Sequence, residues 1–363
     1  MTSARRAHGG GPDVGSVSSA QPQAVLGPAT ATVLVLVLSV RHGVDCCSRV
    51  RALCEDLGDL IRSVDSQDPH TGVSCVVGFG AQVWPRLFGL AAPDQLRPFA
   101  PIRGHRYDAP ATPGDVFLHI RSDRTDLCFE LATRILARLD GAVTAVDEVQ
   151  GFRYFGDRNL LGFVNDGTPK GLTAAAAALI GGDDPEFEGG TFAVVQKYLH
   201  DLTAWNGLSV QDQERIIGRA KRTNRDLGAG RTPSSAHRVL ATFGGEGRRP
   251  PRMLRDHVPF GSPAVDEFGT YFIGYAATPS VVEATLRNIY LGCPRGNYDR
   301  LLDFSSAVTG STFFCPSQAL LRRLAAAPPA TARRPDRRPL TPTGDGGLRR
   351  QRRVGSGGTW PRR

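Results

Sequence analysis

Four side chains in the second half of this 363-residue sequence have types suited to acid–base chemistry and ligand binding. His237 stands in "PSSAHRVLATF", Arg255 and His257 stand in "RMLRDHVPFG", and Asp166 stands in the polar stretch "GFRYFGDRNLLGFVNDGTPKG". In an extended segment, residues i and i+2 face the same way, so Arg255 and His257 would project together and Asp256 would face the other side. An acid, a cation and two imidazoles could then meet. Spacing leaves open the alternative of a loop acid, a surface arginine and core or surface histidines.

The elements that must position these residues follow from hydrophobic periodicity. Apolar runs of strand length alternate with segments whose apolar residues recur at helical spacing. Capping residues mark the helix ends: Asp123 and Gly141 flank one helix, Ser209 with Asp212 opens a second, and Thr278 opens a third. The predicted strands are 32–40, 72–80, 114–122, 189–199 and 268–276, and the predicted helices are 45–64, 123–141, 209–219 and 278–292.

Two of the strand–helix units resemble each other. "GDVFLHIRSDRTDLCFELATRIL" and "GTYFIGYAATPSVVEATLRNIYL" share a glycine start, an apolar strand, a cap and a helix. The repeat predicts an α+β fold with two halves of similar layout, and loops between rigid halves commonly carry sites. Composition adds a Gly/Ser/Pro-rich head and a Pro/Arg/Gly-rich tail that we expect to be disordered. The predicted division is 1–24 for the head, 25–150 and 151–325 for the two halves, and 326–363 for the tail.

Charge and hydropathy argue against a nucleic-acid-binding fold and against a membrane-spanning segment. Hydrophobic residues make up 40% and charged residues 22%, which is ordinary for a globular protein. The formal charge of +9 is concentrated at the end, where ten Arg and two Asp lie between Ala326 and Arg363. A nucleic-acid partner is therefore not expected for the fold, and the tail is better explained as a solvated segment. The apolar run "ATVLVLVLSV" is too short to cross a membrane and predicts a buried strand.

The seven cysteines also limit the chemistry. No pair is spaced as CxxC, which excludes a zinc ribbon and a thioredoxin motif. Most stand in apolar runs such as "TGVSCVVGF" and "DLCFELA", so we expect buried, reduced thiols and a reducing compartment such as the cytoplasm.

At the level of motifs, the chain resembles the dye-decolourising peroxidases, a haem family with two ferredoxin-like domains of antiparallel sheet and helices in the dimeric α/β barrel superfamily. The likeness covers roughly residues 24 to 322 and is closest to the bacterial branch whose members are often packaged in encapsulin shells. The segments that carry it are "APATPGDVFLHIRS", "VDEVQGFRYFGDRNLLGFVNDGTPKG", "VQKYLHDLTAWNGLSVQDQERIIGR", "HVPFG", "DEFGTYFIGYAATPSVVEATLRNIYLG" and "GNYDRLLDFSSAVTGSTFF".

The resemblance implies roles for individual residues. His237 matches the axial ligand of the haem iron, and Asp299 matches the carboxylate that orients its ring, with Asp303 as the alternative. Arg255 matches the distal arginine that contacts haem and peroxide. The family's GxxDG signature falls on "GFVNDG", which makes Asp166 the distal acid–base group. Gly167 and Thr168 follow it and are expected to bind the cofactor.

The implied activity is that of a peroxidase with one haem b per chain. Hydrogen peroxide is the oxidant, and bulky organic donors such as dyes and phenolics are oxidised in one-electron steps. The resemblance further implies a homo-oligomer in the cytoplasm, with an encapsulin compartment as a candidate location. Two alternatives remain: a haem-binding or iron-handling protein with little turnover, and a non-enzymatic module whose Arg-rich tail binds an acidic partner.

The sequence departs from the family at four places. One residue is inserted in the signature, so Asn165 competes with Asp166 for the acid's position, and we favour Asp166. His257 stands where the related branch typically has Asn. The run "RAKRTNRDLGAGRTPSSAH" is basic where the family is acidic, and the tail lacks a clear docking peptide, so we expect an altered docking signal.

Overall fold

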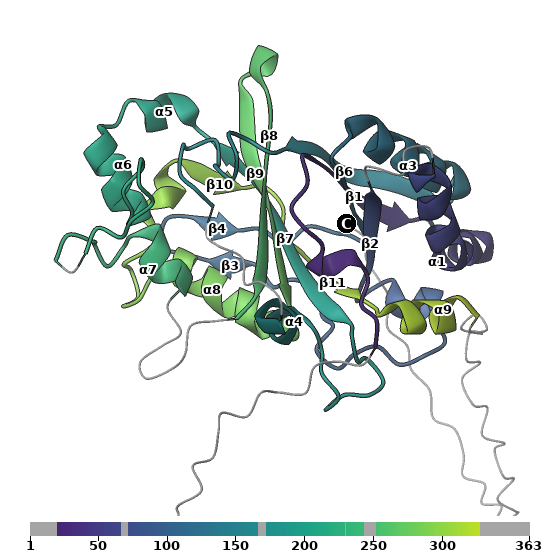
Figure 1. Ribbon diagram of the computed structural model, residues 1–363. Helices are drawn as coiled ribbons and strands as arrows, with labels where there is room; N and C mark the ends of the chain where they lie inside the picture. Colours follow the sequence, from purple (N-terminus) through teal and green to yellow (C-terminus); the bar gives the residue numbers. More distant parts are fainter. Residues whose placement is uncertain (1–19, 67–71, 166–171, 229, 243–251, 327–363) are drawn as a thin grey trace, which may run out of the picture. The chain divides into compact units, whose positions relative to one another are not determined.

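The strands form one antiparallel sheet to which both halves of the chain contribute (Figure 1). The computed structural model describes residues 20–66, 72–165, 172–228, 230–242 and 252–326, and within them nine strands run in the order β6-β1-β5-β2-β11-β7-β9-β8, with β10 beside β7. The strands are β1 (Thr32–Val40), β2 (Val73–Gly80), β5 (Val116–Ser122), β6 (Val143–Phe152), β7 (Thr191–His200), β8 (Leu254–Ser262), β9 (Glu267–Ala276), β10 (Ser305–Ala307) and β11 (Ser311–Cys315); β3 (Ile102–Arg103) and β4 (Asp108–Ala109) pair separately.

Helices connect the strands in both halves. They are α1 (Val44–Asp65), α2 (Trp84–Leu87), α3 (Thr125–Arg138), α4 (Leu172–Ala178), α5 (Leu202–Asn206), α6 (Val210–Ile217), α7 (His237–Thr242), α8 (Pro279–Leu291) and α9 (Gln318–Ala326). Short 3-10 turns are η1 (Ala24–Leu26), η2 (Pro263–Val265) and η3 (Arg300–Asp303).

The two halves have the same topology. The first half contributes four long strands, which lie across the sheet in the order β6-β1-β5-β2, and the second half contributes four, in the order β11-β7-β9-β8. If the strands of each half are numbered along the chain, both orders read 4-1-3-2. Helix α3 joins the third and fourth strands of the first half, and α8 follows the third strand of the second half. The predicted α+β fold of duplicated, ferredoxin-like halves is confirmed. The halves meet where β2 pairs with β11.

Strand β1 shows why its sequence is apolar without interruption. Leu36 lies in the hydrophobic cluster shared with α1, α3 and α9, whereas its neighbour Val35 lies in the cluster between the two halves. Successive side chains of a strand point to opposite faces, so burial of both faces requires an unbroken apolar run. The predicted buried strand is confirmed.

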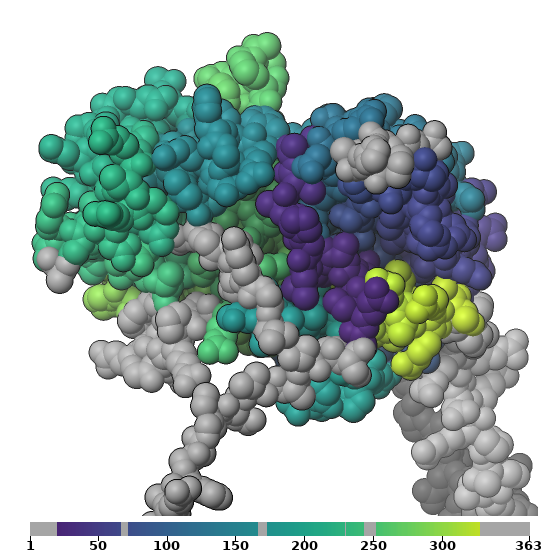
Figure 2. All heavy atoms as spheres, in the orientation of Figure 1, coloured from purple at the N-terminus to yellow at the C-terminus, as the bar shows by residue number. Residues whose placement is uncertain are grey.

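The sheet curls until its two end strands meet. A Cβ on Gly151 in β6 would lie 2.0 Å from Cγ1 of Val258 in β8, so only glycine fits this contact. The N-terminal segment from residue 20 runs between the halves and reaches α9 (Figure 2). There the buried side-chain amide of Gln23 hydrogen-bonds to the backbone of Val77 and Pro316, which ties the segment to both halves.

Two of the three predicted helix caps are in place and one is wrong. Ser209 is the N-cap of α6, and its hydroxyl accepts a hydrogen bond from the amide of Asp212. Thr278 is the N-cap residue of α8, although its hydroxyl contacts other side chains. Asp123 does not cap α3, because its carboxylate accepts a hydrogen bond from the amide of Ala31 at 2.8 Å. The Asp123 carboxylate thus contacts a residue distant in sequence and not the first turn of α3.

The cysteines are unpaired, and four of them are buried. Burial raises the pKa of the Cys54 and Cys75 thiols to about 12, which keeps them protonated and unreactive. Among the described helices, none is long and apolar enough to cross a membrane.

Candidate active site

A cavity in the second half brings together most of the residues singled out in the sequence. It encloses about 1100 Å³, its open mouth included, and its wall comes from β7, β8, β9, α7, α8, η3 and the segment 159–165. Apolar side chains such as Phe272 and Leu286 make up much of the wall. Polar groups also converge on it, as is usual for a ligand site. They include His237, Arg255 and His257.

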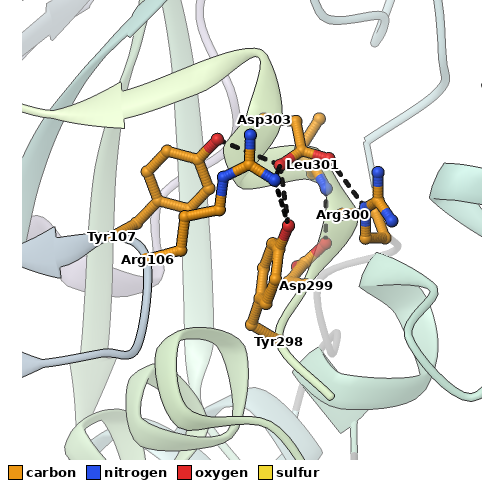
Figure 3. A network of polar contacts seen from close by, with 7 residues as sticks. All are labelled: Arg106, Tyr107, Tyr298, Asp299, Arg300, Leu301 and Asp303. Atoms are coloured by element: carbon orange, nitrogen blue, oxygen red, sulfur yellow. Dashed lines mark hydrogen bonds and ion pairs between the residues drawn. The ribbon is translucent and has the colours of Figure 1, made fainter. Parts of the chain in front are cut away.

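His237 is held by a buried carboxylate. It is the first residue of α7, and its Nδ1 lies 2.6 Å from Oδ2 of Asp299. The side chain of Asp299 is only 1% exposed, and its Oδ1 accepts a hydrogen bond from the amide of Leu301 at the start of η3 (Figure 3). A carboxylate at Nδ1 favours the tautomer with the proton on that nitrogen, which puts the lone pair on Nε2.

Asp303, the alternative partner from the sequence, belongs to a different network. Its Oδ1 accepts hydrogen bonds from the hydroxyls of Tyr107 and Tyr298, both at 3.0 Å, and its Oδ2 accepts from Nε of Arg300 at 2.7 Å (Figure 3). Of the two carboxylates, Asp299 is thus the one that contacts His237.

Strand β8 confirms the predicted alternation. Arg255 and His257 both line the cavity, where Arg255 donates to the carbonyl of Ala241 at 2.7 Å and the His257 ring packs against Phe272. Asp256 faces away, with its Oδ2 3.5 Å from Nε2 of His119. Full burial holds the pKa of His119 well below its usual value, so that this ring is neutral. Burial also raises the pKa of Asp256.

In the described part of the polar stretch, residues 151–165, polar side chains hold the loop together. The Arg158 guanidinium donates to the carbonyls of Gly162 and Lys221, and the Asn159 side chain accepts from the amide of Phe163. An irregular segment lacks regular backbone pairing, so polar side chains take its place. Asn165 lines the cavity.

Three predicted residues of this stretch cannot be placed. Asp166, Gly167 and Thr168 lie outside the described residues, and Asn165 is the last residue before that gap. The competition between Asn165 and Asp166 for the acid's position therefore stays a prediction.

His200 is a cavity residue that the sequence analysis missed. Its Nδ1 lies 2.7 Å from the hydroxyl of Ser305, and its Nε2 lies 2.8 Å from that of Thr270. Burial lowers its pKa to about 4, so the ring is neutral at pH 7. Its partners come from β10 and β9, which are distant in sequence, and no local pattern could identify them.

Two arginines at the cavity lie in or next to the basic run noted as a departure from the family: Arg219 opens the run, and Arg238 follows its last residue. Arg238 pairs with Asp226, and its Nε is buried without a hydrogen-bond partner in the described part of the chain. Arg219 lies 3.7 Å from the same carboxylate. Both side chains line the cavity. Guanidinium groups at the wall suit a ligand with carboxylates.

Comparison with known proteins gives a consistent result. The family model described as Dyp-type peroxidase, N-terminal, matches residues 22–153, and that described as Dyp-type peroxidase, C-terminal, matches residues 156–320. A dye-decolorizing peroxidase of Mycolicibacterium paratuberculosis is 46% identical over 86% of this chain and 88% of its own length. A dye-decolorizing peroxidase of Mycobacterium tuberculosis is 44% identical over 83% of this chain and 90% of its own length.

Solved structures agree with the sequence relatives. DyPB from Rhodococcus jostii RHA1 matches with a TM-score of 0.81 and 47% identity, covering 83% of this chain and 97% of that one. A variant of that protein is described as a complex with heme. The encapsulated DyP-type peroxidase from Mycobacterium smegmatis matches with a TM-score of 0.82 and 42% identity, covering 85% of this chain and 99% of that one.

His200 should make stability depend on pH. The pKa of His200 is about 4 in the folded chain and 6.5 when unperturbed. Between about pH 6.5 and about pH 4, the histidine is therefore protonated in the unfolded state but neutral in the folded state. Stability is then lost as pH falls, by about 2 kcal/mol between about pH 7.5 and about pH 5. We expect His200→Gln, compared with the parent by urea unfolding at both pH values, to have a shallower dependence. Equal losses of stability in the two proteins would contradict the assignment.

Proposed function

Since the chain belongs to the Dyp-type peroxidase family, we propose that the cavity beside His237 is its haem site and that the residues around it divide the work of peroxide cleavage. The protein is an oxidoreductase, a haem-dependent peroxidase that uses hydrogen peroxide to oxidise dyes and other bulky organic donors. The observation that supports the site best is the 2.6 Å contact between His237 Nδ1 and the buried carboxylate of Asp299 at the cavity wall.

The residues present fit a haem b, one per chain. The largely apolar wall suits a flat macrocycle, and a histidine with a carboxylate at Nδ1 suits an iron ligand. The unpartnered Nε of Arg238 and the guanidinium of Arg219 suit the carboxylates at the edge of the group. When bound, the haem supplies the iron at which the O–O bond of peroxide is cleaved and the oxidising equivalents that donors consume.

His237 would bind the iron through Nε2. The carboxylate of Asp299 keeps the proton on Nδ1, fixes the ring and raises the basicity of the coordinating nitrogen. Asp299 is itself fixed by the amide of Leu301, so the ring position is set by two successive hydrogen bonds. Asp299 is therefore a positioning residue.

Arg255 would stabilise negative charge. Its guanidinium is held in the cavity by the carbonyl of Ala241, which costs little reorganisation when charge develops on a bound peroxide. Asp166 would move a proton from the inner to the outer oxygen of peroxide, so that water leaves, with Gly167 and Thr168 completing the cofactor contacts. His257 would be its neighbour in the same cavity.

We also propose that the chain works as a homo-oligomer and as cargo of an encapsulin shell, with hydrogen peroxide and organic donors as its small-molecule partners. The support for shell packaging is the likeness to the encapsulated peroxidase of Mycobacterium smegmatis. The docking segment would lie in residues 327–363, outside the described part of the chain.

His237→Ala should lose or greatly weaken haem binding, because the iron loses its only proposed protein ligand. The readout is the Soret absorbance per chain after reconstitution, with circular dichroism to check the fold. His105→Ala, at an exposed histidine, is the control and should load like the parent. Full loading of His237→Ala with an unchanged Soret spectrum would overturn the assignment.

Arg255→Leu should keep haem and slow the reaction with peroxide. A positioned charge donor is worth roughly 3–4 kcal/mol, or about 10²–10³ in rate. Stopped-flow absorbance after mixing with peroxide measures this step directly. Arg252→Leu changes an exposed arginine just before the same strand and should react at the parental rate. A rate for Arg255→Leu within a few-fold of the parent rejects the proposed role.

The proton shuttle can be identified by pH. A free aspartate side chain has a pKa near ~3.9 and is ionised above that value, whereas a free histidine side chain, near ~6.5, is an effective base only above its own value. We expect the peroxide reaction to persist at acidic pH and to be mostly lost in Asp166→Asn. If His257 is the base instead, the rate will rise with an apparent pKa of about 6–7 and His257→Asn will remove that rise. Parental turnover of Asp166→Asn at acidic pH refutes the assignment to Asp166.

Deletion of residues 327–363 should separate packaging from catalysis. Helix α9 ends at Ala326, and its buried Leu320, Leu321 and Leu324 stay in place, so fold and dye oxidation should survive. Co-purification with a co-expressed shell should be lost. The control is Leu324→Ala in the full chain, which opens a core cavity and should cost about 2–5 kcal/mol of stability. A truncated chain that unfolds, or that still packages, contradicts the proposal.

A further inference from the structure

A histidine that has no part in the steps proposed so far lies in the cavity wall between two hydroxyls. Nδ1 of His200 on β7 is 2.7 Å from Oγ of Ser305 on β10, and Nε2 is 2.8 Å from Oγ1 of Thr270 on β9. All three side chains line the cavity. Ser305 is 4% exposed and Thr270 is 9% exposed, so bulk water competes little for either hydroxyl.

The three residues form a row along the wall because their strands are neighbours. In this part of the sheet, β7 has β10 on one side and β9 on the other, and β8 follows β9. Ser305 lies opposite His200, and Thr270 lies opposite Tyr198, which is two residues from His200 and therefore on the same face of β7. The row thus runs from β10 toward β8, the strand that places Arg255 in the cavity.

A neutral imidazole between two hydroxyls gives this row a direction. The ring carries a proton on one nitrogen only, so it donates to one hydroxyl and accepts from the other. When the accepting nitrogen takes up a proton and the other nitrogen releases its own, a net proton has crossed the ring. A hydroxyl can donate and accept at the same time, so the transfer can continue at both ends. The row therefore has the groups that a proton relay requires.

The acidity of the ring agrees with this use. Burial lowers the pKa of His200 to about 4, so the ring does not keep an extra proton at neutral pH. A group through which protons pass must release each one, whereas a group that stays charged would hold it.

The reduction of peroxide consumes protons. Hydrogen peroxide, two electrons and two protons give two molecules of water. The transfer proposed for Asp166 moves a proton between the two oxygens of peroxide and brings none in. A phenol loses a proton along with its electron, but a donor without an ionisable proton gives the electron alone. With such a donor, both protons must come from water.

We propose that Ser305, His200 and Thr270 form a proton relay that supplies the cavity while donors reduce the oxidised site. The inference rests on the proposed haem site at His237. For each electron, the hydroxyl of Ser305 gives its proton to Nδ1 of His200, and Nε2 gives its proton to the hydroxyl of Thr270. Thr270 releases its own proton into the cavity, and water returns a proton to Ser305. Rotation of the ring and the hydroxyls restores the starting arrangement. Two transfers, with two donor electrons, turn the remaining peroxide oxygen into water.

The test compares two electron donors. Hexacyanoferrate(II) gives an electron and no proton, whereas hydroquinone gives both. His200→Gln keeps a side chain that donates and accepts hydrogen bonds but cannot take up and release a proton. Its kcat with hexacyanoferrate(II) should fall about tenfold or more, and its kcat with hydroquinone should change less than about twofold. The Soret spectrum and the stopped-flow rate with peroxide should stay parental. Equal losses with both donors would show a merely structural role and overturn the relay.

A hydroxyl variant and a matched control extend the comparison. Thr270→Val keeps the shape of the side chain without its hydroxyl and should show the same loss with hexacyanoferrate(II) only. Thr191→Val is the control, because Thr191 is a buried residue of β7 outside the cavity wall whose hydroxyl donates to the carbonyl of Ala276 at 3.3 Å. It should behave like the parent with both donors. A Thr270→Val chain with parental kcat for hexacyanoferrate(II) contradicts the proposal.

The state of the ring can be measured without turnover. Deuterium exchange at the imidazole C2 position, followed by peptide mass spectrometry over a range of pH, gives the pKa of His200 in the haem-loaded chain. We expect a value of about 4. A value at or above the ordinary 6.5 would mean that the ring holds its proton, which rejects the relay.

The outcomes separate this proposal from the proposed haem site. A parent chain that binds no haem, or whose Soret band does not respond to peroxide, rejects the haem site and the relay together. If the parent responds to peroxide and His200→Gln oxidises hexacyanoferrate(II) at the parental rate, the haem site stands and the relay alone is rejected.

Discussion

The hydrogen bond between His237 Nδ1 and Asp299 is the contact on which the site depends. It joins α7 to the start of η3, and Asp299 is 1% exposed, so its carboxylate has few alternatives to its partners. A buried carboxylate without a partner is strongly disfavoured, which means the fold itself selects the ring orientation and tautomer of His237. The same short turn ends in Asp303, so one segment supports both the proposed iron ligand and the contacts of Asp303 with Tyr107 and Tyr298.

Strand β8 contributes two further cavity side chains, because every second residue of a strand points to the same face. Arg255 and His257 both line the cavity, and Asp256 between them lies on the opposite face of the strand. There its Oδ2 lies 3.5 Å from Nε2 of the neutral His119 ring. Nδ1 of the same ring lies 2.9 Å from the hydroxyl of Tyr275. A shift of one residue in the register would place the side chain of Asp256 in the cavity and those of Arg255 and His257 on the opposite face. The polar contact behind the strand therefore helps to specify the register that the site requires.

Much of this could be predicted from the sequence because it depends on local rules. Strand and helix periodicity gave the repeat that becomes two halves of identical strand order, and alternation placed Arg255 with His257. The features that the sequence analysis predicted wrongly or missed depend on contacts between residues distant in sequence. Asp123 was predicted as a cap, but its carboxylate accepts a hydrogen bond from Ala31. His200 was not singled out at all, although Ser305 of β10 and Thr270 of β9 contact its ring. No local pattern encodes which distant segment will supply such a partner.

A difference between the two halves explains why the cavity beside His237 lies in the second half. Between its first and second strands, the first half has the long helix α1, whose buried face packs with α3 and α9 into a continuous apolar core. At the corresponding position, the described residues of the second half form the short helices α5, α6 and α7. Short helices cannot cover a sheet as one long helix does, so space remains between α7, α8 and the strands, and polar side chains line it. The proposed chemistry thus occupies the place where the first half has the packing helix α1 and the described residues of the second half have shorter helices.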